Sequence, residues 1–443
     1  MKARNYHVIT YGCQMNEHDS EKIRGMLESM GYNEVKKAEE ADIIVINTCL
    51  IRENAELTVY GKVGALKKFK EENPDLVLAV GGCMMQKDTT AKKLYNKHPE
   101  VDIIFGTHNL PRLPSLIENV KEGNDKIIEI SDAPLEANKD SETPVKRESD
   151  IKAWITVIRG CENYCSYCVV PHVRGPERSR PEAQILEEIK GVVYNGVKEV
   201  TLLGQNVNAY GKDLEKDKNF ADLLKKAADI KGLQRIRYMT SHPRDFDEQM
   251  IEVTAGTDKI SSHYHLPVQS GSDSVLKMMN RGYTRANYLN LVEKIRSHDP
   301  AAAITTDIIV GFPGEKESDF QKTIDLVEEC RFDMAFTFAY SERPDTRAQK
   351  MEDDVDPEVR QERLQELMEV QNRISQEKNQ ELVDETVEIL VEGESRKNPE
   401  TFAGRTETNK LVIIPKDEGL RGKLIPVKIN EAGSWTLYGE PLI

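Results

Sequence analysis

Apolar and amphipathic segments alternate along the first part of this 443-residue chain, and this alternation restricts its fold more than any other feature. Short apolar segments, which predict β-strands, occupy residues 6–10, 42–46 and 76–80. Amphipathic segments, which predict helices, occupy residues 20–30, 53–69 and 86–96. Strand–helix alternation of this kind predicts an α/β fold, a doubly wound parallel sheet with right-handed crossovers.

A cysteine follows each of the three predicted strands. These are Cys13, Cys49 and Cys83, separated by 36 and 34 residues, and each spacing matches one strand-plus-helix unit. Because loops after parallel strands emerge at the same carboxyl edge, where ligands bind, we expect the three thiols to converge. Gly12 and Gly82 stand beside them, and the lack of a side chain lets the backbone approach a bulky ligand.

The alternative is that these three cysteines are structural, since free cysteine is among the most buried residue types. Their repeated position in three successive units favours a ligand set. Cys330 has no comparable context and is expected to be a core residue of the helical stretch 321–330. The total of seven cysteines, an odd number, argues against a secreted disulfide framework and for reduced thiols that bind metal.

Three further cysteines, Cys161, Cys165 and Cys168, form a compact C-x3-C-x2-C triplet. Three thiolates so close together can hold three irons of an iron–sulfur cubane, which usually takes four cysteines. The fourth iron would then keep an open position for a small molecule. Alternatives are a zinc site lacking one ligand, or scattered core thiols. Zinc sites normally bring a second C-x2-C arm or a following histidine, and His172 fits those patterns poorly.

The second part of the chain again alternates strands and helices. Its predicted strands are residues 154–158, 199–203, 235–239, 263–267, 304–310 and 334–339. Six such units predict a partial (β/α)6 barrel with its site at the carboxyl face, where the loop that carries the triplet opens. Residues 131–150, rich in Pro, Ser, Glu and Lys, predict a linker before this barrel.

The last part of the chain begins with a charged segment, residues 357–383, that predicts a connecting helix. Its inner stripe is expected to consist of Leu364, Leu367, Met368 and Ile374. Short strands are predicted at residues 386–392, 410–415, 424–429 and 435–438. They indicate a small β-barrel of a kind used for oligonucleotide binding. The predicted domains are residues 1–135, 150–375 and 376–443.

The net charge is −15, from 61 lysines and arginines against 76 aspartates and glutamates. This is the wrong sign for binding nucleic acid by bulk charge, so phosphate contacts would need local basic clusters. Candidate clusters are Arg174, Arg178 and Arg180 beside the triplet, and Arg235 with Arg237. For any single arginine, an ion pair with a nearby glutamate is the preferred interpretation.

No apolar run approaches membrane-spanning length, and the first residues lack the apolar region of a signal peptide. The sequence therefore predicts a cytoplasmic protein with no membrane partner.

The triplet resembles the signature of the radical S-adenosylmethionine enzymes. Its flanks, Gly160 with Cys161 and the CVVPHVRG segment of residues 168–175, resemble the methylthiotransferases. The segment TYGCQMNEHDS, residues 10–20, is similar to the branch that acts on tRNA, the 2-methylthio-N6-dimethylallyladenosine synthases. Residues 404–412 and 434–439 resemble the TRAM domain, an RNA-binding module, in which Arg405 and Lys410 would contact RNA. The resemblance covers essentially the whole chain.

The resemblance implies two 4Fe-4S clusters and S-adenosyl-L-methionine as cofactors. It places a radical-generating cluster on Cys161, Cys165 and Cys168, and an auxiliary cluster, where sulfur is delivered, on Cys13, Cys49 and Cys83. It also implies replacement of a hydrogen by a methylthio group at carbon 2 of isopentenylated adenosine next to the anticodon of tRNA. An electron donor such as flavodoxin or ferredoxin would be a further partner.

Contacts to S-adenosylmethionine are expected at the ends of the barrel strands. Candidates are Gln205, Gln269, Ser270 and Asp307. Asp307 begins a segment, residues 307–315, that only loosely resembles the adenine-contacting G-x-I-x-G-x-x-E pattern of radical enzymes. Asp307 stands at its first glycine, and Gly314 stands where its glutamate would be. An ordinary turn at residues 311–314 is the alternative.

Two other functions fit the same motifs. A sister methylthiotransferase would modify threonylcarbamoyl-adenosine in tRNA or an aspartate of a ribosomal protein. An iron–sulfur electron carrier with an RNA-binding tail belongs to a different class. A carrier needs fully ligated clusters, whereas three cysteines at each site predict an open iron, and a carrier would form no 5′-deoxyadenosine.

Overall fold

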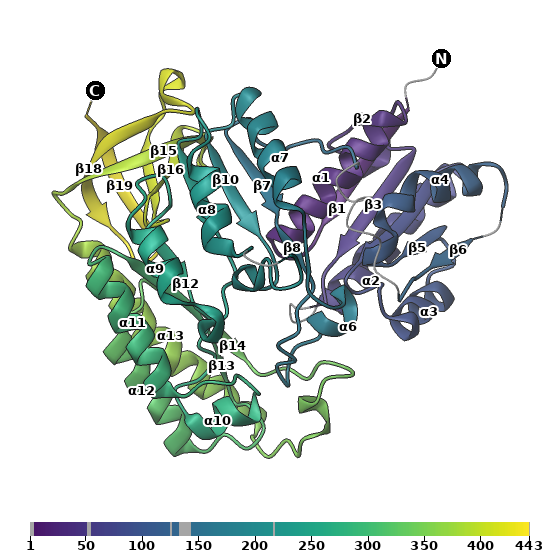
Figure 1. Cartoon of the computed structure of the whole chain (residues 1–443). Coiled ribbons are helices and arrows are strands. Elements are labelled where there is room, and N and C mark those ends of the chain that lie inside the picture. Colours follow the sequence, from purple (N-terminus) through teal and green to yellow (C-terminus); the bar gives the residue numbers. More distant parts are fainter. Residues whose placement is uncertain (1–3, 51–54, 125, 133–142, 216–217, 443) are drawn as a thin grey trace.

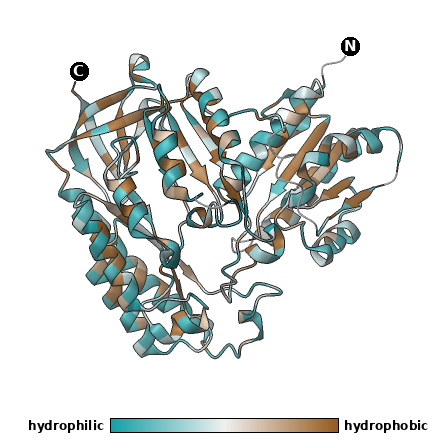
Figure 2. Cartoon of the chain, in the orientation of Figure 1, coloured by the Kyte–Doolittle hydropathy of each residue, from teal (hydrophilic) through white to brown (hydrophobic). Residues whose placement is uncertain are grey.

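The computed structural model describes residues 4–50, 55–124, 126–132, 143–215 and 218–442. Figure 1 shows an N-terminal sheet with its helices, a larger central region and a small C-terminal barrel that lies against the central region. Apolar residues gather on the strands and polar residues on the outer faces of the helices (Figure 2). None of the described helices is both long and apolar enough to cross a membrane.

The N-terminal sheet has six parallel strands in the order β2-β1-β3-β4-β5-β6. The strands are β1 (Asn5–Thr10), β2 (Asn33–Glu34), β3 (Ile43–Thr48), β4 (Val77–Gly82), β5 (Ile103–Phe105) and β6 (Ile127–Glu129). The three predicted strands correspond to β1, β3 and β4, which are neighbours. Because the chain passes from β1 outward to β2 and then back to β3, the direction of winding reverses between β1 and β3. Ligands bind at such a reversal point in open α/β sheets.

Helices cover both faces of this sheet, which confirms the doubly wound fold. One face packs against α1 (Gln14–Ser29) and α4 (Leu113–Lys121), and the other against α2 (Ala55–Glu72) and α3 (Asp88–Lys97). Helix α1 begins six residues before its predicted start at residue 20. The early turns escape a hydropathy pattern because their buried side chains, from Asn16 to Lys22, are polar.

The central region contains the six predicted strands as two three-stranded parallel sheets, β11-β10-β7 and β12-β13-β14. The strands are β7 (Lys152–Thr156), β10 (Glu199–Leu203), β11 (Arg235–Tyr238), β12 (His263–His265), β13 (Ala303–Val310) and β14 (Met334–Ala339). A single bridge between Ile236 and Ile260 connects the two sheets. Because β7 and β14 are both edge strands, the barrel is open on one side, as predicted for a partial (β/α)6 barrel.

Helices surround this open barrel on its outer side. They are α7 (Glu182–Tyr194), α8 (Phe220–Ala228), α9 (Glu248–Ala255), α10 (Asp273–Met278), α11 (Arg285–His298) and α12 (Glu317–Cys330). Alternate residues of each strand, such as Ile155, Leu202 and Ile308, join the helices in one apolar core. Cys330 lies in this core with 1% of its surface exposed, as the sequence predicts. The shorter elements α6 (Val170–Arg174), β8 (Ile158–Arg159) and β9 (Arg178–Ser179) lie beside the triplet.

The connecting helix is α13 (Pro357–Gln380), and its inner stripe differs from the predicted one. Leu367 and Ile374 are buried and Leu364 is partly buried, but Met368 is 39% exposed, so its assignment to the stripe was wrong. The buried face of α13 includes polar residues that a hydropathy pattern omits. Two of them are Arg363, paired with Glu315, and Gln371, which donates to the carbonyl of Phe332.

The C-terminal strands close into a barrel in the order β15-β16-β17-β19-β18. The strands are β15 (Thr386–Glu394), β16 (Thr401–Thr406), β17 (Leu411–Pro415), β18 (Leu424–Ala432) and β19 (Thr436–Pro441). The small barrel was therefore predicted correctly, except that β16 was missed. Lys410 fixes the barrel to the central region, because its Nζ lies 2.9 Å from both Asp333 Oδ1 and Asn379 Oδ1.

Residues 143–150, the last described part of the predicted linker, pack between the N-terminal sheet and the central region. Arg147 pairs with Glu21 of α1 and with Glu188 of α7. A Cβ added to Gly25 would lie 2.3 Å from the carbonyl oxygen of Pro144, so this segment contacts α1 directly. These eight residues therefore join the two regions by contacts as well as by covalent connection.

Candidate functional site

The three N-terminal cysteines meet at the carboxyl edge of the sheet, as predicted. Cys13 is the N-cap of α1, Cys49 directly follows β3, and Cys83 directly follows β4. Cys49 and Cys83 are only 1% and 2% exposed. The loops contact each other, since the Cys83 amide donates to the Thr48 carbonyl at 3.0 Å. The topology thus brings together three thiols that are far apart in the sequence.

Glycine is required at two points where these loops approach each other. At Gly12, with a φ of +133°, an added Cβ would stand 2.9 Å from Cys49 Cβ. At Gly82, with a φ of +99°, it would stand 2.5 Å from the Thr48 carbonyl oxygen. Both values are closer than van der Waals contact, and a positive φ is costly for residues with a side chain. These glycines let the loops approach each other closely, whereas the approach to a ligand that the sequence suggested stays a prediction.

Buried polar side chains, which the sequence reasoning missed, hold the three strand ends together. The Asn47 side-chain amide donates to the Asn16 carbonyl, and the Asn16 amide donates to the Thr48 carbonyl, both at 2.8 Å. The Thr48 hydroxyl donates to the Gly81 carbonyl at 2.6 Å. Asn47 and Thr48 lie immediately before Cys49, so polar residues at the end of a buried strand were the available signal. The network fixes the backbone that carries the thiols.

A buried arginine from the central region lies beside this first cysteine group. Arg174, at the end of α6 and 5% exposed, donates from Nη1 to Asp19 Oδ2 at 2.9 Å. Burial raises the pKa of the Cys83 thiol to about 11, the Arg174 charge opposes that rise, and the thiolates of Cys49 and Cys13 add to it. Thiols in such a place lose their protons when positive charge, above all a metal, compensates the thiolates.

The second group, the C-x3-C-x2-C triplet, is held in a single loop. The Cys161 amide donates to the Gly175 carbonyl at 3.2 Å, and the Cys168 amide to the Cys165 carbonyl at 3.0 Å. The Gly160 amide donates to Gln205 Oε1 at 2.6 Å. Gln205, one of the predicted cofactor contacts, thus lies beside the triplet.

Arg281 is a buried arginine beside the triplet, as Arg174 is beside the first group. It is 4% exposed, its Nη1 lies 3.2 Å from Cys165 Sγ, and its Nη2 donates to the Pro267 carbonyl at 2.6 Å. Burial raises the pKa of Cys161 to about 11 and that of Cys168 to about 12. Each cysteine group therefore combines three buried or partly buried thiols with one buried guanidinium. The sequence reasoning did not identify Arg281 and considered Arg174 only as a phosphate contact.

The short helix α6 connects the two cysteine groups. Val169 directly follows Cys168, and Val169 and Val173 pack against Cys83 in one apolar cluster. The hydroxyl of Thr107, which follows the N-terminal sheet strand β5, donates to the Val173 carbonyl at 2.8 Å. The chain therefore passes from the triplet to the first group within a few residues, so both groups belong to one region of the molecule.

Among the described residues, neither cysteine group has the geometry of a single-ion site. Within the described ranges, no three His, Cys, Asp or Glu side chains form a group that could hold one metal ion. The ligands of a single zinc ion surround it tetrahedrally at about 2.0–2.3 Å. Cysteines that bind different irons of one cluster are held farther apart.

The other predicted cofactor contacts lie at the ends of β12 and β13. The backbone N–H of Gln269 donates to the backbone carbonyl of Asp307 at 2.9 Å, and Gln269 adopts a positive φ of 73°. Ser270 is fully buried, and its hydroxyl accepts a hydrogen bond from the Ser272 amide at 3.2 Å. Asp307 is partly exposed, and its Oδ1 lies 3.5 Å from His265 Nε2. Gln269 and Asp307 are thus adjacent, whereas Ser270 has a packing position.

The segment after β13 forms a turn in which Glu315 faces the protein. Its Oε2 accepts hydrogen bonds from the Gly311 amide at 2.5 Å and from Arg363 at 3.1 Å. Burial raises the pKa of Glu315 to about 7, while these two donors oppose the rise. The carboxylate therefore fixes the turn of residues 311–314.

The arginines proposed as phosphate contacts are mostly structural. Arg180 pairs with Glu188 at 2.8 Å, and Arg237 pairs with Glu199 at 2.9 Å. Arg235 and Arg237 donate to backbone carbonyls of β16 and the residue after it, which fixes the C-terminal barrel. Pairing with glutamate, preferred for any single arginine, is confirmed for Arg180 and Arg237. These buried charges are not available to a polyanion.

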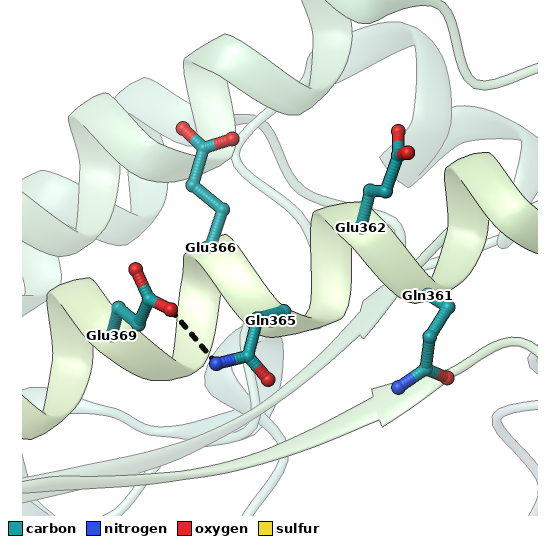
Figure 3. A pocket seen from close by; sticks show the side chains of 5 residues that line it. All are labelled: Gln361, Glu362, Gln365, Glu366 and Glu369. Atoms are coloured by element: carbon teal, nitrogen blue, oxygen red, sulfur yellow. Dashed lines mark hydrogen bonds between the residues drawn. The ribbon is translucent and has the colours of Figure 1, made fainter.

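A shallow hollow of about 400 Å³ lies on the outer face of α13. Its lining residues are Gln361, Glu362, Gln365, Glu366 and Glu369. Figure 3 shows these side chains along one side of the helix, with the Gln365 amide donating to Glu369 at 2.8 Å. Three carboxylates on a helix that carries no cysteine form a solvated acidic surface, and we assign no site to it.

Three family models match successive parts of the chain. They are described as Uncharacterized protein family UPF0004 (residues 5–106), Radical SAM superfamily (residues 155–327) and TRAM domain (residues 380–442). The radical S-adenosylmethionine model covers the triplet, which implies a 4Fe-4S cluster and S-adenosylmethionine there. The first model covers Cys13, Cys49 and Cys83.

Relatives of similar length match almost the entire chain. A tRNA-2-methylthio-N(6)-dimethylallyladenosine synthase of Carboxydothermus hydrogenoformans is 53% identical over 99% of this chain and 99% of its own. Proteins with the same name from Desulforamulus reducens and Natranaerobius thermophilus are 52% and 49% identical, over 99% of this chain and 95% and 97% of theirs.

Solved structures support the fold alone. The radical S-adenosylmethionine methyltransferase TsrM from Kitasatospora setae matches with a TM-score of 0.59 at 14% identity, covering 78% of this chain and 74% of TsrM. The cobalamin-dependent radical enzyme OxsB matches with a TM-score of 0.52 at 13% identity, covering 83% of this chain and 56% of OxsB.

Proposed function

The chain belongs to the tRNA-2-methylthio-N(6)-dimethylallyladenosine synthase family of radical S-adenosylmethionine enzymes, and on this premise we propose its reaction and site. It replaces the hydrogen at carbon 2 of isopentenylated adenosine, next to the anticodon of tRNA, by a methylthio group. About half of its residues are identical to those of synthases across 99% of its length. The observation that carries the proposal is the pair of three-cysteine groups connected by α6.

At the triplet, Cys161, Cys165 and Cys168 are the proposed ligands of the radical-generating 4Fe-4S cluster. When bound, this cluster supplies the electron that cleaves S-adenosylmethionine and yields a 5′-deoxyadenosyl radical. Arg281, 3.2 Å from Cys165 Sγ, offsets the negative charge of the thiolates. Gln205 fixes the start of the loop through the Gly160 amide. A reactive radical requires a site shielded from water, and the partial barrel around the loop would provide part of that shield.

At the sheet edge, Cys13, Cys49 and Cys83 are the proposed ligands of the auxiliary 4Fe-4S cluster, from which sulfur is delivered. A cluster held there by three thiols would have no fourth cysteine ligand, and it would supply the sulfur that is transferred. Cys13 lies at the N-terminus of α1, and Arg174 provides a buried positive charge beside this group. The contact of Val169 and Val173 with Cys83 supports delivery to a substrate activated beside the triplet.

Two partners complete the proposal. The substrate is tRNA, for which the names of the relatives and the C-terminal TRAM match are the support. A one-electron donor such as flavodoxin or ferredoxin is needed because the cleavage consumes an electron. A tRNA substrate also places the enzyme in the cytoplasm.

The decisive experiment combines tRNA analysis with reconstitution. Mass spectrometry of tRNA nucleosides should show that cells lacking this gene lose the methylthio group and keep isopentenylated adenosine. Anaerobically reconstituted protein should restore it on that tRNA with S-adenosylmethionine and a reductant. Loss of a methylthio group from threonylcarbamoyl-adenosine instead would identify a sister enzyme. Reconstituted protein that forms no 5′-deoxyadenosine would be an electron carrier, and the proposed reaction would be wrong.

A further inference from the structure

The last strand of the open barrel, β14, presents two exposed aromatic rings. Phe336 is 42% exposed and Phe338 is 50% exposed. They are two residues apart, so they project from the same side of the strand. Single exposed apolar residues are common, but adjacent ones on a sheet face are characteristic of a binding surface.

The register of the sheet shows that this side faces the barrel interior. Phe336 stands opposite Asp307 of β13, and Phe338 stands opposite Ile309. Ala335, which precedes Phe336 and therefore points to the opposite side, joins Ile308 in the apolar core beneath the outer helices. Because successive side chains alternate between the two faces of a strand, both phenylalanines point away from those helices. They therefore lie on the inner wall of the barrel, at its open edge.

The wall around the two rings is polar and fixed in place. His265 lies 6.1 Å from the Phe336 ring, centre to centre, in an edge-on arrangement. Its Nδ1 lies 3.0 Å from the Thr305 hydroxyl, and its Nε2 lies 3.5 Å from Asp307. A packed core does not explain exposed phenylalanines among such neighbours. One edge of Phe336 is held by His265, which leaves ring surface available for a ligand.

The aromatic pair is also connected to the triplet. The chain that leaves β14 returns to the cysteine loop, where the Ala348 amide donates to the Ser166 carbonyl at 2.8 Å. Arg347 donates to the Tyr164 carbonyl at 2.5 Å. These two bonds hold the segment that follows β14 against the loop between Cys161 and Cys168. The segment that follows β14 thus joins the strand that carries the two rings to the loop that carries the triplet.

We propose that Phe336 and Phe338 form the surface on which the isopentenylated adenine of the substrate tRNA stacks. This inference rests on the proposed function. A base must leave its helical stack to reach a barrel interior, and aromatic rings replace the stacking that it loses. The ring face of adenine and the apolar isopentenyl group both match phenylalanine. An unmodified adenine offers only its ring face. The two phenylalanines would therefore bind the isopentenylated base more tightly than the unmodified one.

The test measures binding with full-length reconstituted protein. The probes are two fluorescent anticodon stem-loops that differ only in the isopentenyl group of one adenosine. Wild-type protein should bind the isopentenylated probe at least about tenfold more tightly than the unmodified probe. Phe336→Ala and Phe338→Ala should each weaken binding of the isopentenylated probe by about tenfold or more and bring the two affinities together. Tyr194→Ala, at a 92% exposed aromatic of α7, is the matched control and should change neither affinity.

Cofactor binding and folding are measured on the same variants. Because both rings are exposed, melting temperature and S-adenosylmethionine affinity should remain those of the wild type. Weaker S-adenosylmethionine binding with unchanged RNA binding would assign the pair to the adenine of the cofactor and overturn the inference. Equal loss for both probes, or an affinity ratio near one in the wild type, would also overturn it. Product formation is scored separately: no methylthiolated product from wild-type protein contradicts the proposed reaction, whatever the affinity ratio.

Discussion

The two cysteine groups have the same composition, three cysteines and one buried arginine, but the fold assembles them in different ways. The triplet lies within eight residues of one loop, so local hydrogen bonds such as Cys168 to Cys165 position its thiols. The N-terminal group requires three strand ends to align at one edge of a parallel sheet. The first arrangement depends on a loop and the second on a whole domain. Substitutions that disturb the support of the N-terminal group should therefore lower the stability of its domain. Substitutions in the triplet should mainly reduce activity.

Removing a thiol from the triplet should have the largest effect. Cys165→Ala should reduce S-adenosylmethionine cleavage to background, because a cluster with two protein ligands is not retained there. The measurement is 5′-deoxyadenosine formed by reduced, reconstituted protein. Iron content should fall from about eight to about four per chain, since the other cubane remains. Retained cleavage would contradict the radical assignment.

Removing a thiol from the N-terminal group should separate the two chemistries. Cys49→Ala should leave 5′-deoxyadenosine formation intact and stop methylthio insertion, with iron again near four per chain. Chromatography of the cofactor products and mass spectrometry of the tRNA nucleosides read the two activities independently. Continued insertion by this variant would mean that Cys13, Cys49 and Cys83 are structural.

The two buried arginines allow a direct test of the different constructions. Arg174→Gln removes the 2.9 Å partner of Asp19, whose nearest remaining cation is Arg159 at 3.5 Å, so we expect a loss of about 3 kcal/mol of unfolding free energy. Denaturant unfolding measures this loss. The electron paramagnetic resonance signal of the auxiliary cluster should change, while that of the triplet cluster should not.

Arg281→Gln is the matched variant at the triplet. It should reverse the spectroscopic pattern, because the guanidinium lies 3.2 Å from Cys165 Sγ. If both variants altered the same cluster signal, the assignment of one arginine to each group would be wrong.

The smallest effects should come from the hydrogen bonds that support each group. Gln205→Ala removes one bond to the Gly160 amide and should cost about 1 kcal/mol. Asn16→Ala should cost about twice as much, because the Asn16 side chain is buried and joins the first turn of α1 to the Thr48 carbonyl at the end of β3. Urea titrations of both variants measure the difference. An equal loss of unfolding free energy in the two variants would contradict the proposed difference between the two hydrogen bonds.

The sequence predicted most strands of the central region because their patterns are local. The predicted residues 334–339 coincide with β14, and residues 199–203 coincide with β10. Short polar elements were missed. The first turns of α1 bury Asn16 and His18, which no hydropathy pattern marks as internal. Met368 was wrongly assigned to the inner face of α13. A hydropathy pattern follows apolar residues, whereas the true buried face also contains Arg363 and Gln371.

The sequence by itself determined the chemistry, because cysteine spacing and strand–helix periodicity are properties of the chain. It placed three thiols in one loop and one thiol at the end of each of three strands. Only the tertiary structure decided which charges accompany them. Arg174 and Arg281 reach the thiols across 91 and 116 residues, from Cys83 and Cys165 respectively. Such pairings depend on packing between elements distant in the chain, and no local pattern encodes them.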